Sequence, residues 1–271
     1  MEKQISNDRD GGTVNYKLLM DTAMLAGEIM MSAGAETYRV EDTMEHILKT
    51  SKCESIEAFA LMTGIVATLS GSDMEQPITM VKTINNRSTN MNNIMKVNAI
   101  SRKYCGGKLS LEDAYYQLKH VYEHQYSRFD FTLGTIGIGV GFAMMFSGTL
   151  LDVVATTVVG LVLAICIVFG RIIGMNSILE DIFSCASISL STMLLRQFLI
   201  PELNIDIVII SAIMPLVPGV AITNAIRDTL QGDYLSGCAR ILEAFLKASS
   251  IALGIGVGMT LFKMWIGGVL L

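Results

Sequence analysis

The chain has 271 residues, a formal net charge of −5, and 51% hydrophobic against 17% charged residues. The charges are unevenly distributed, because residues 1–128 hold 14 Lys and Arg and 16 Asp and Glu, whereas residues 129–271 hold 6 and 9. The second part has too few charges for a water-facing surface, and its apolar runs are too long for a single core. These numbers exclude a wholly soluble enzyme and a nucleic-acid-binding chain. They predict a soluble domain over 1–128 and a transmembrane domain over 129–271.

The residue pattern of the soluble part predicts an α+β domain. Apolar residues at helical spacing predict helix over 15–50, interrupted at Gly27 and Gly34, where another backbone should come close. Three β-like runs follow at 55–62, 64–69 and 78–84, and further helices are expected over 90–104 and 111–126. Ser110 opens the last helix with a Ser-x-x-Asp pattern close to a capping box.

A short motif in this domain offers an enzymatic alternative. His120, Glu123 and His124 spell His-x-x-Glu-His, which on one helix would place both imidazoles on the same face, as in one class of zinc peptidase. The motif is short, and no acidic ligand helix follows it, so a solvated helix face is the simpler interpretation. The five cysteines form no Cys-x-x-Cys pair and favour a reducing compartment. The sequence therefore predicts neither metal nor cofactor, and no enzyme.

Five runs in the second part approach the roughly 20 apolar residues that a helix needs to cross a bilayer. They lie near 131–149, 151–170, 177–200, 206–226 and 243–267. The fold class predicted is therefore membrane α-helical, an N-terminal cytoplasmic α+β domain followed by a bundle of about five transmembrane helices. The Lys and Arg residues between spans fall on alternate sides, which predicts a cytoplasmic N-terminus and an external C-terminus.

The fourth predicted span is interrupted in its middle. Pro215, Pro218 and Gly219 lie within it and remove backbone hydrogen bonds that neighbours, water or a ligand must replace. Broken helices near the membrane midplane are a recurrent device of secondary transporters. A simple packing kink is the alternative.

Polar residues gather directly after this broken span. They are Asn224, Arg227, Asp228, Asp233 and Arg240. A dense group of charges at a helix end is normally an interfacial loop, but it can also form a site at the cytoplasmic mouth of a pathway. In that case Arg227 or Arg240 could bind a substrate carboxylate, and Asp228 or Asp233 could carry a coupling proton.

Two adjacent carboxylates in the third predicted span are further candidates for proton transfer. Glu180 and Asp181 are costly within a membrane unless they are used or paired. Adjacent helix positions point about 100° apart, so at most one of the two should face a pathway.

Two segments resemble the bacterial threonine/serine exporter family. The first covers 26–41, with Gly34, Glu36, Thr37 and Arg39 in the matching N-terminal signature. The second covers 218–244, with Pro218, Gly219, Asn224, Arg227, Asp228, Gly232, Asp233, Gly237 and Arg240 in the matching membrane signature. Both segments occur in the order that the family shows.

The resemblance implies a multi-pass protein of the bacterial cytoplasmic membrane that exports small hydrophilic metabolites, driven by the proton motive force. Longer family members carry a second membrane half, so this chain resembles the large subunit of split members. These work with a small integral-membrane partner of about 150 residues, enough for four or five spans. Threonine and serine are the substrates that the family name gives, and a dicarboxylate such as succinate is the alternative that split members imply. A homo- or hetero-oligomer is compatible with this, and a passive channel or assembly scaffold is a third interpretation.

Overall fold

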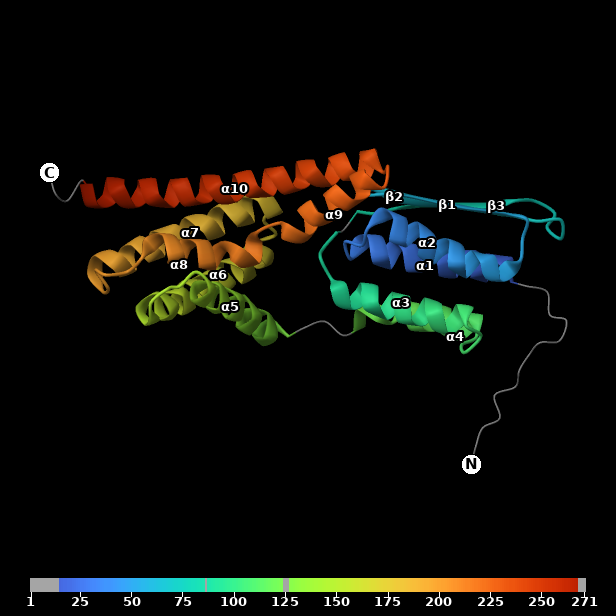
Figure 1. Ribbon diagram of the computed structural model, residues 1–271, viewed down its shortest axis with the longest axis horizontal. Helices are drawn as coiled ribbons and strands as arrows, with labels where there is room; N and C mark the ends of the chain where they lie inside the picture. The colour runs from blue at the N-terminus through green and yellow to red at the C-terminus, as the bar shows by residue number, and fades with distance from the viewer. Residues whose placement is uncertain (1–14, 86, 124–126, 268–271) are drawn as a thin grey trace, which may run out of the picture. The chain divides into compact units, whose positions relative to one another are not determined.

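The structure is a computed structural model that describes residues 15–85, 87–123 and 127–267 (Figure 1). The chain forms two compact units. The first combines Met1–His124 with Thr223–Arg240, and the second combines Gln125–Ile222 with Ile241–Leu271. The units therefore differ from a simple division at residue 128, because the end of the fourth predicted span and the residues after it cluster with the N-terminal residues.

Four helices in the described residues form the N-terminal part of the first unit, and three of them begin where the sequence offers a side-chain cap. They are α1 (Tyr16–Ser32), α2 (Thr37–Leu48), α3 (Met91–Cys105) and α4 (Leu111–Lys119), with short 3₁₀ turns η1 (Lys49–Ser51) and η2 (Val121–Glu123). Asn15, Asn90 and Ser110 each accept a hydrogen bond from a backbone N–H in the first turn of the helix that follows. Gly27 does not interrupt α1 as expected, and the side chains of Met44 and Ile65 pack against it rather than another backbone.

The helix expected over 111–126 is shorter in the structure. It ends at Lys119, because His120 takes φ −98° and ψ 8° and the chain continues as the 3₁₀ turn η2. The prediction that the imidazoles of His120 and His124 share one face of a continuous helix therefore lacks that helix beyond Lys119, and His124 itself lies outside the described residues. Within the described residues no group of three His, Cys, Asp or Glu is placed to hold a metal ion.

A three-stranded antiparallel sheet covers α1 and α2 (Figure 1). Its strands are β1 (Ser55–Leu61), β2 (Gly64–Ser70) and β3 (Ile78–Thr83), in that order, which confirms the three predicted runs. Alternate residues of β2, Ile65, Ala67 and Leu69, are buried against the two helices. The helices α3 and α4 pack on the other side of α1, so the unit has three layers.

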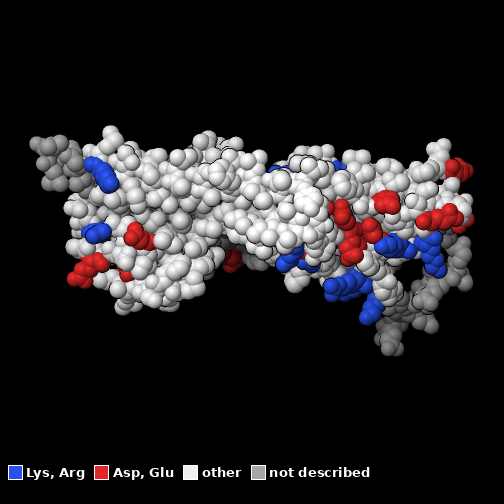
Figure 2. All heavy atoms as spheres, turned by 45° about the horizontal axis from the view of Figure 1, so that its top comes forward, with Lys and Arg blue, Asp and Glu red and all other residues white. Residues whose placement is uncertain are grey.

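The second unit is helical. Its elements are α5 (Arg128–Met145), α6 (Leu150–Ile173), α7 (Ser177–Phe198), α8 (Ile205–Ile213), η3 (Met214–Leu216), the start of α9 (Gly219–Leu230) and most of α10 (Tyr234–Gly267). Ser127 with Asp130, and Thr149 with Asp152, form capping boxes at the starts of α5 and α6. Figure 2 shows that charged side chains gather over the first unit and leave much of the second uncharged.

Three helices in the described part of the chain are long and apolar enough to cross a membrane: Leu150–Ile173, Ser177–Phe198 and Tyr234–Trp265. The pair Ile205–Leu216 and Gly219–Leu230, bent by 58°, would make a fourth span if it crosses as one. The apolar part of α5, Phe129–Met145, is shorter. The structure thus supports a mostly helical protein with three or four candidate spans, and the five-helix bundle remains a prediction.

Close contacts between α7 and α10 depend on glycine. A Cβ atom at Gly254 would lie 2.7 Å from Cys185 Cβ and would also meet the carbonyl oxygen of Ile182. A Cβ atom at Gly258 would meet Ser189 Oγ and the carbonyl oxygen of Ala186. The hydroxyl of Ser189 donates to the carbonyl oxygen of Ile255 at 3.2 Å, which joins the two helices at the same place.

Candidate functional site

The carboxylate of Asp228, near the end of α9, is fully buried. It accepts a hydrogen bond from Arg240 Nε at 2.8 Å, and the backbone N–H and hydroxyl of Thr37 donate to its two oxygens at 3.1 Å each. Thr37 opens α2, and the preceding Glu36 supplies no side-chain cap. Asp228, about 190 residues further along the chain, therefore accepts a hydrogen bond from a backbone N–H that is otherwise unpaired at the N-terminus of α2. The helix dipole favours a negative charge at this end of the helix.

The loop between α1 and α2 provides the acceptors for the remaining polar groups. Arg240 Nη2 donates to the carbonyl oxygen of Ala35 at 2.6 Å, and Asn224 Nδ2 donates to that of Gly34 at 2.8 Å. Gly34 has φ +82°, a left-handed conformation that glycine adopts without strain. The turn at Gly34 thus presents two successive carbonyls to residues of α9 and α10.

Glu36 completes the arrangement. Its buried side chain pairs with Arg227 through Oε1, and Arg39 Nη1 lies 3.8 Å from Oε2. Oε2 accepts no hydrogen bond from the described residues. We call Glu36, Thr37, Asn224, Arg227, Asp228 and Arg240 the Asp228 cluster.

The cluster brings together residues that the sequence singled out in two distant segments. Glu36 and Thr37, with Gly34 and Arg39 beside them, meet Asn224, Arg227, Asp228 and Arg240 within the first unit. The burial differs between the two arginines, because the side chain of Arg227 is 50% exposed and that of Arg240 only 7%. Arg240 is bonded to Asp228 and Ala35 and is buried, whereas Arg227 pairs with Glu36 and keeps half of its side chain exposed.

Asp233 lies beside the cluster rather than in it. It belongs to the turn between α9 and α10, where its backbone N–H donates to the carbonyl oxygen of Asp228 at 2.9 Å. Partial burial raises the pKa of the Asp233 carboxyl above its ordinary value, and the negative charge of Asp228 raises it further. Asp233 therefore binds a proton more readily than an ordinary aspartate.

The other predicted site residues lie in the second unit. Pro215 is in η3, Val217 is extended at φ −61° and ψ 127°, and α9 begins at Gly219 after Pro218. The structure thus has the expected break in the fourth span. Asp181 is buried in α7 and pairs with Lys247 of α10 at 3.5 Å, whereas the neighbouring Glu180 is half-buried.

Sequence reasoning missed several of these groups. The acceptors at Gly34 and Ala35 are backbone carbonyls, which carry no side-chain signal. The pairing of Lys247 with Asp181 had a partial signal, since a lysine and an aspartate in neighbouring apolar spans are each costly alone.

The turn at Gly34 should be sensitive to any side chain. We expect Gly34→Ala to lower the free energy of unfolding by about 1–2 kcal/mol for the left-handed backbone alone. An added Cβ would also lie 3.2 Å from the carbonyl oxygen of Ser88, which increases the loss. Gly107→Ala is the control, because Gly107 has φ +68° and no atom within 4 Å of the added Cβ. Thermal unfolding of the two variants should show the larger loss for Gly34→Ala, and equal losses would contradict the close packing of this turn.

Glu41 should make the first unit less stable as the pH rises. Its carboxylate accepts a hydrogen bond from the backbone N–H of Ala60 at 2.8 Å, yet burial raises its pKa above the ordinary 4.5, with Asp233, Glu45 and Asp228 adding to the shift. The folded state therefore binds the proton more tightly than the unfolded state, so stability falls as the pH rises from the unfolded pKa through the raised one.

We expect Glu41→Gln, which keeps an acceptor for Ala60, to remove part of this fall and to raise the melting temperature at neutral pH. The measurement is the melting temperature across a pH series. A variant whose profile parallels the wild type, or which melts lower at neutral pH, would show that the ionised carboxylate does not oppose folding.

The apolar helices, the broken span and the buried ionic cluster define a helical membrane protein with a polar site at the end of the broken helix. Residues 21–262 match the family model described as "Putative threonine/serine exporter". The chain belongs to the threonine/serine exporter family.

Among known relatives, the chain is similar to the "Probable threonine/serine exporter" of Mycobacterium tuberculosis (strain ATCC 25618 / H37Rv), with 21% identity over 249 residues. The alignment covers 91% of this chain and 46% of the relative, so the chain spans about half the length of that protein. No solved structure matches the chain.

Proposed function

We propose that the protein is a subunit of a proton-coupled exporter of threonine/serine-type amino acids in the bacterial cytoplasmic membrane, with its N-terminus cytoplasmic and its C-terminus external. The Asp228 cluster carries this proposal. Hydrogen bonds from Thr37 to Asp228 and the ion pair of Glu36 with Arg227 join the polar end of the broken span to the N-terminal signature. The pair of Asp228 with Arg240 is buried beside them, and buried ionic groups that do not serve function are costly.

The cluster suggests how the predicted roles are divided. Arg227 is half exposed and can present its planar fork to a substrate carboxylate, whereas Arg240 is buried and fixes Asp228. Asp233 is only partly buried and has a raised pKa, which suits a proton carrier better than the fully buried Asp228. In this division Asp228 and Arg240 stabilise the site, Arg227 binds the solute, and Asp233 carries the proton.

Further membrane helices should complete the pathway. The relative is about twice as long as the part that this chain matches, and the described residues contain three or four candidate spans. We propose that a small integral-membrane partner of about 150 residues, or further copies of this chain, supplies the remaining helices around the solute.

Efflux measurements test the function. The chain, with the membrane protein encoded beside its gene, is expressed in bacterial cells loaded with threonine, serine or succinate, and the intracellular level of each is followed. We expect threonine and serine to leave faster than from cells with empty vector, and a protonophore to slow the efflux. Unchanged levels of all three solutes would refute an exporter. Efflux of succinate alone would assign the dicarboxylate substrate instead.

Substitution of the exposed arginine separates a coupled transporter from a channel or scaffold. Arg227→Gln should abolish efflux while the chain still assembles in the membrane, whereas a scaffold would keep the partner's efflux intact. Lys96→Gln, in α3 of the same unit, is the charge-matched control.

A further inference from the structure

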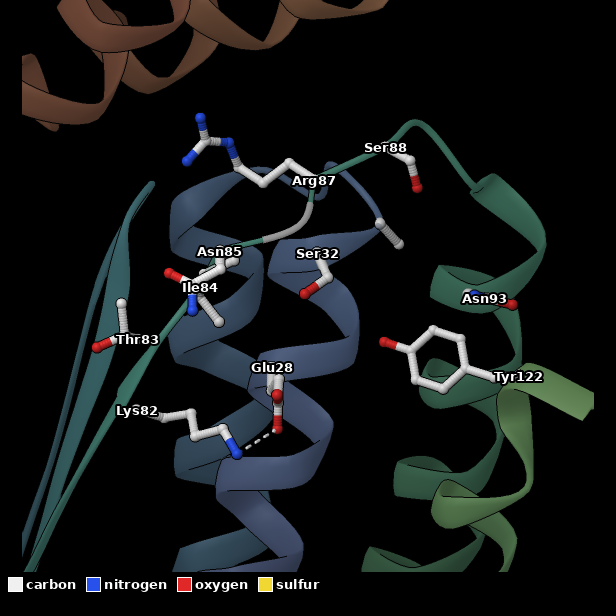
Figure 3. A pocket seen from close by; sticks show the side chains of 11 residues that line it. Glu28, Ser32, Lys82, Thr83, Ile84, Asn85, Arg87, Ser88, Asn93 and Tyr122 are labelled. Atoms are coloured by element: carbon white, nitrogen blue, oxygen red, sulfur yellow. Dashed lines mark ion pairs between the residues drawn. The ribbon is translucent and has the colours of Figure 1, made fainter. Parts of the chain in front are cut away.

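A second polar site lies in the first unit, apart from the side chains of the Asp228 cluster. A cavity of about 550 Å³ opens between α1, the end of β3, α3 and η2 (Figure 3). This volume is in the range of small-molecule sites. Its polar lining residues include Glu28, Ser32, Lys82, Asn85, Asn93 and Tyr122.

Three charged residues line the cavity: the carboxylate of Glu28, the ammonium group of Lys82, and Arg87, whose guanidinium donates to the carbonyl oxygen of Met62 at 3.5 Å. Lys82 Nζ lies 3.3 Å from Glu28 Oε2, with the two side chains 51% and 31% exposed. Figure 3 shows this pair on one wall and Arg87 pointing away from it. A partly exposed ion pair of this kind contributes little to the stability of the fold. Each of its two groups can therefore leave the other and pair with the opposite charge of a ligand at a small cost in free energy.

The opposite wall offers neutral hydrogen-bonding groups. Asn93 is only 6% exposed and lines the cavity, and its backbone N–H donates to Asn90 Oδ1 at 3.1 Å. Its side-chain amide offers a ligand both a hydrogen-bond donor and an acceptor. Burial raises the pKa of Tyr122, with the charge of Glu28 adding to the shift, so its hydroxyl stays protonated beside Ser32.

We propose that this cavity binds a free zwitterionic α-amino acid, with its ammonium group on Glu28, its carboxylate on Lys82 and its side chain toward Asn93. A zwitterion matches both charges. A dicarboxylate would place a second negative charge beside Glu28, and a diamine would place a second positive charge beside Lys82, so each would be repelled. The assignment rests on the groups in the cavity and not on the proposed export function.

The ligand would touch the segment that holds the Asp228 cluster. Ser32 and Ser88 line the cavity, and the backbone N–H of Ser88 donates to the carbonyl oxygen of Ser32 at 2.8 Å. Two and three residues after Ser32, Gly34 and Ala35 accept the hydrogen bonds of Asn224 and Arg240. An amino acid in the cavity therefore stabilises the end of α1 from which the cluster is held.

Calorimetric titration of the full chain in detergent tests the site, with L-threonine, succinate and putrescine as probes. We expect saturable binding of threonine at one site, with little heat from the other two. Glu28→Gln and Lys82→Met should each weaken threonine binding about tenfold or more, the loss of one charge-assisted contact. The matched controls are Glu57→Gln and Lys17→Met, exposed residues of the same unit, which should bind as the wild type does.

Three results would overturn the assignment: no saturable threonine binding, tighter binding of succinate or putrescine, or threonine binding that neither cavity variant changes. The last would place the amino acid elsewhere, as in a translocation pathway. Efflux of threonine is measured separately, so a failure of export with intact binding refutes only the proposed function. Melting temperatures of the variants verify that they remain folded.

Discussion

Asp228→Asn is expected to lower the free energy of unfolding by about 3–5 kcal/mol, the usual cost of removing one partner of a buried ion pair, and to abolish export. The substitution leaves Arg240 buried without its counter-charge. It also removes an acceptor, because the new NH2 group takes the place either of Oδ1, which accepts from the backbone N–H of Thr37, or of Oδ2, which accepts from the Thr37 hydroxyl and from Arg240 Nε. Thermal unfolding of the full chain in detergent and efflux from loaded cells measure the two effects.

Asp42→Asn is the matched control for this variant. Asp42 lies on α2, close to Thr37, but its side chain is 67% exposed and pairs only with His46 among the described residues. We expect its melting temperature and efflux to stay near those of the wild type. Equal losses of melting temperature and efflux in the two variants would show that the buried ion pair contributes no more to stability and export than an exposed carboxylate does.

A double-mutant cycle separates pairing from burial. Asp228→Asn combined with Arg240→Met should cost less than the sum of the two single changes, because the double variant leaves no buried charge unpaired. If the two costs add, Asp228 and Arg240 are not coupled. Export should stay absent in the double variant, since a neutral pair restores stability without restoring the charges.

Alanine at Gly254 or Gly258 is expected to destabilise the membrane helices by about 1–3 kcal/mol each, the usual cost of overpacking. An added Cβ at either position would meet a backbone carbonyl of α7, and backbone cannot move aside as a side chain can. The two helices would have to separate, which would also weaken the bond from Ser189 to Ile255 and the pair of Lys247 with Asp181.

Gly256 provides a control in the same helix. No atom lies within 4 Å of a Cβ added there, and alanine favours a helix over glycine by about 1 kcal/mol. Gly256→Ala should therefore melt at or slightly above the temperature of the wild type. Thermal unfolding in detergent compares the three variants, and a loss at Gly256 as large as at Gly254 would show that the effect is not due to contact with α7.

Local patterns were sufficient for most elements. The three β-like runs, the helix expected from residue 90 and the capping pattern at Ser110 depend on neighbouring residues, and the structure confirms them. α4 ends earlier than predicted, because apolar spacing continues past Lys119 while the backbone turns at His120. The neighbour of Gly27 also differs from the prediction, since the sequence pattern cannot distinguish a neighbouring backbone from the side chain of Met44.

The sequence by itself determined the division between a charged part and an apolar part, the break at Pro215 and Pro218, and the two segments that resemble the exporter family. The first two follow from composition and local backbone chemistry, and the third is a resemblance of residue patterns. Only the tertiary structure decided that Asp228 and Arg240 meet Thr37 and the carbonyl of Ala35, because such contacts join residues about 190 to 205 positions apart. The physical reason is that a buried carboxylate takes its donors from whichever segment the fold brings near it, and backbone groups, which every residue carries, leave no mark in the sequence.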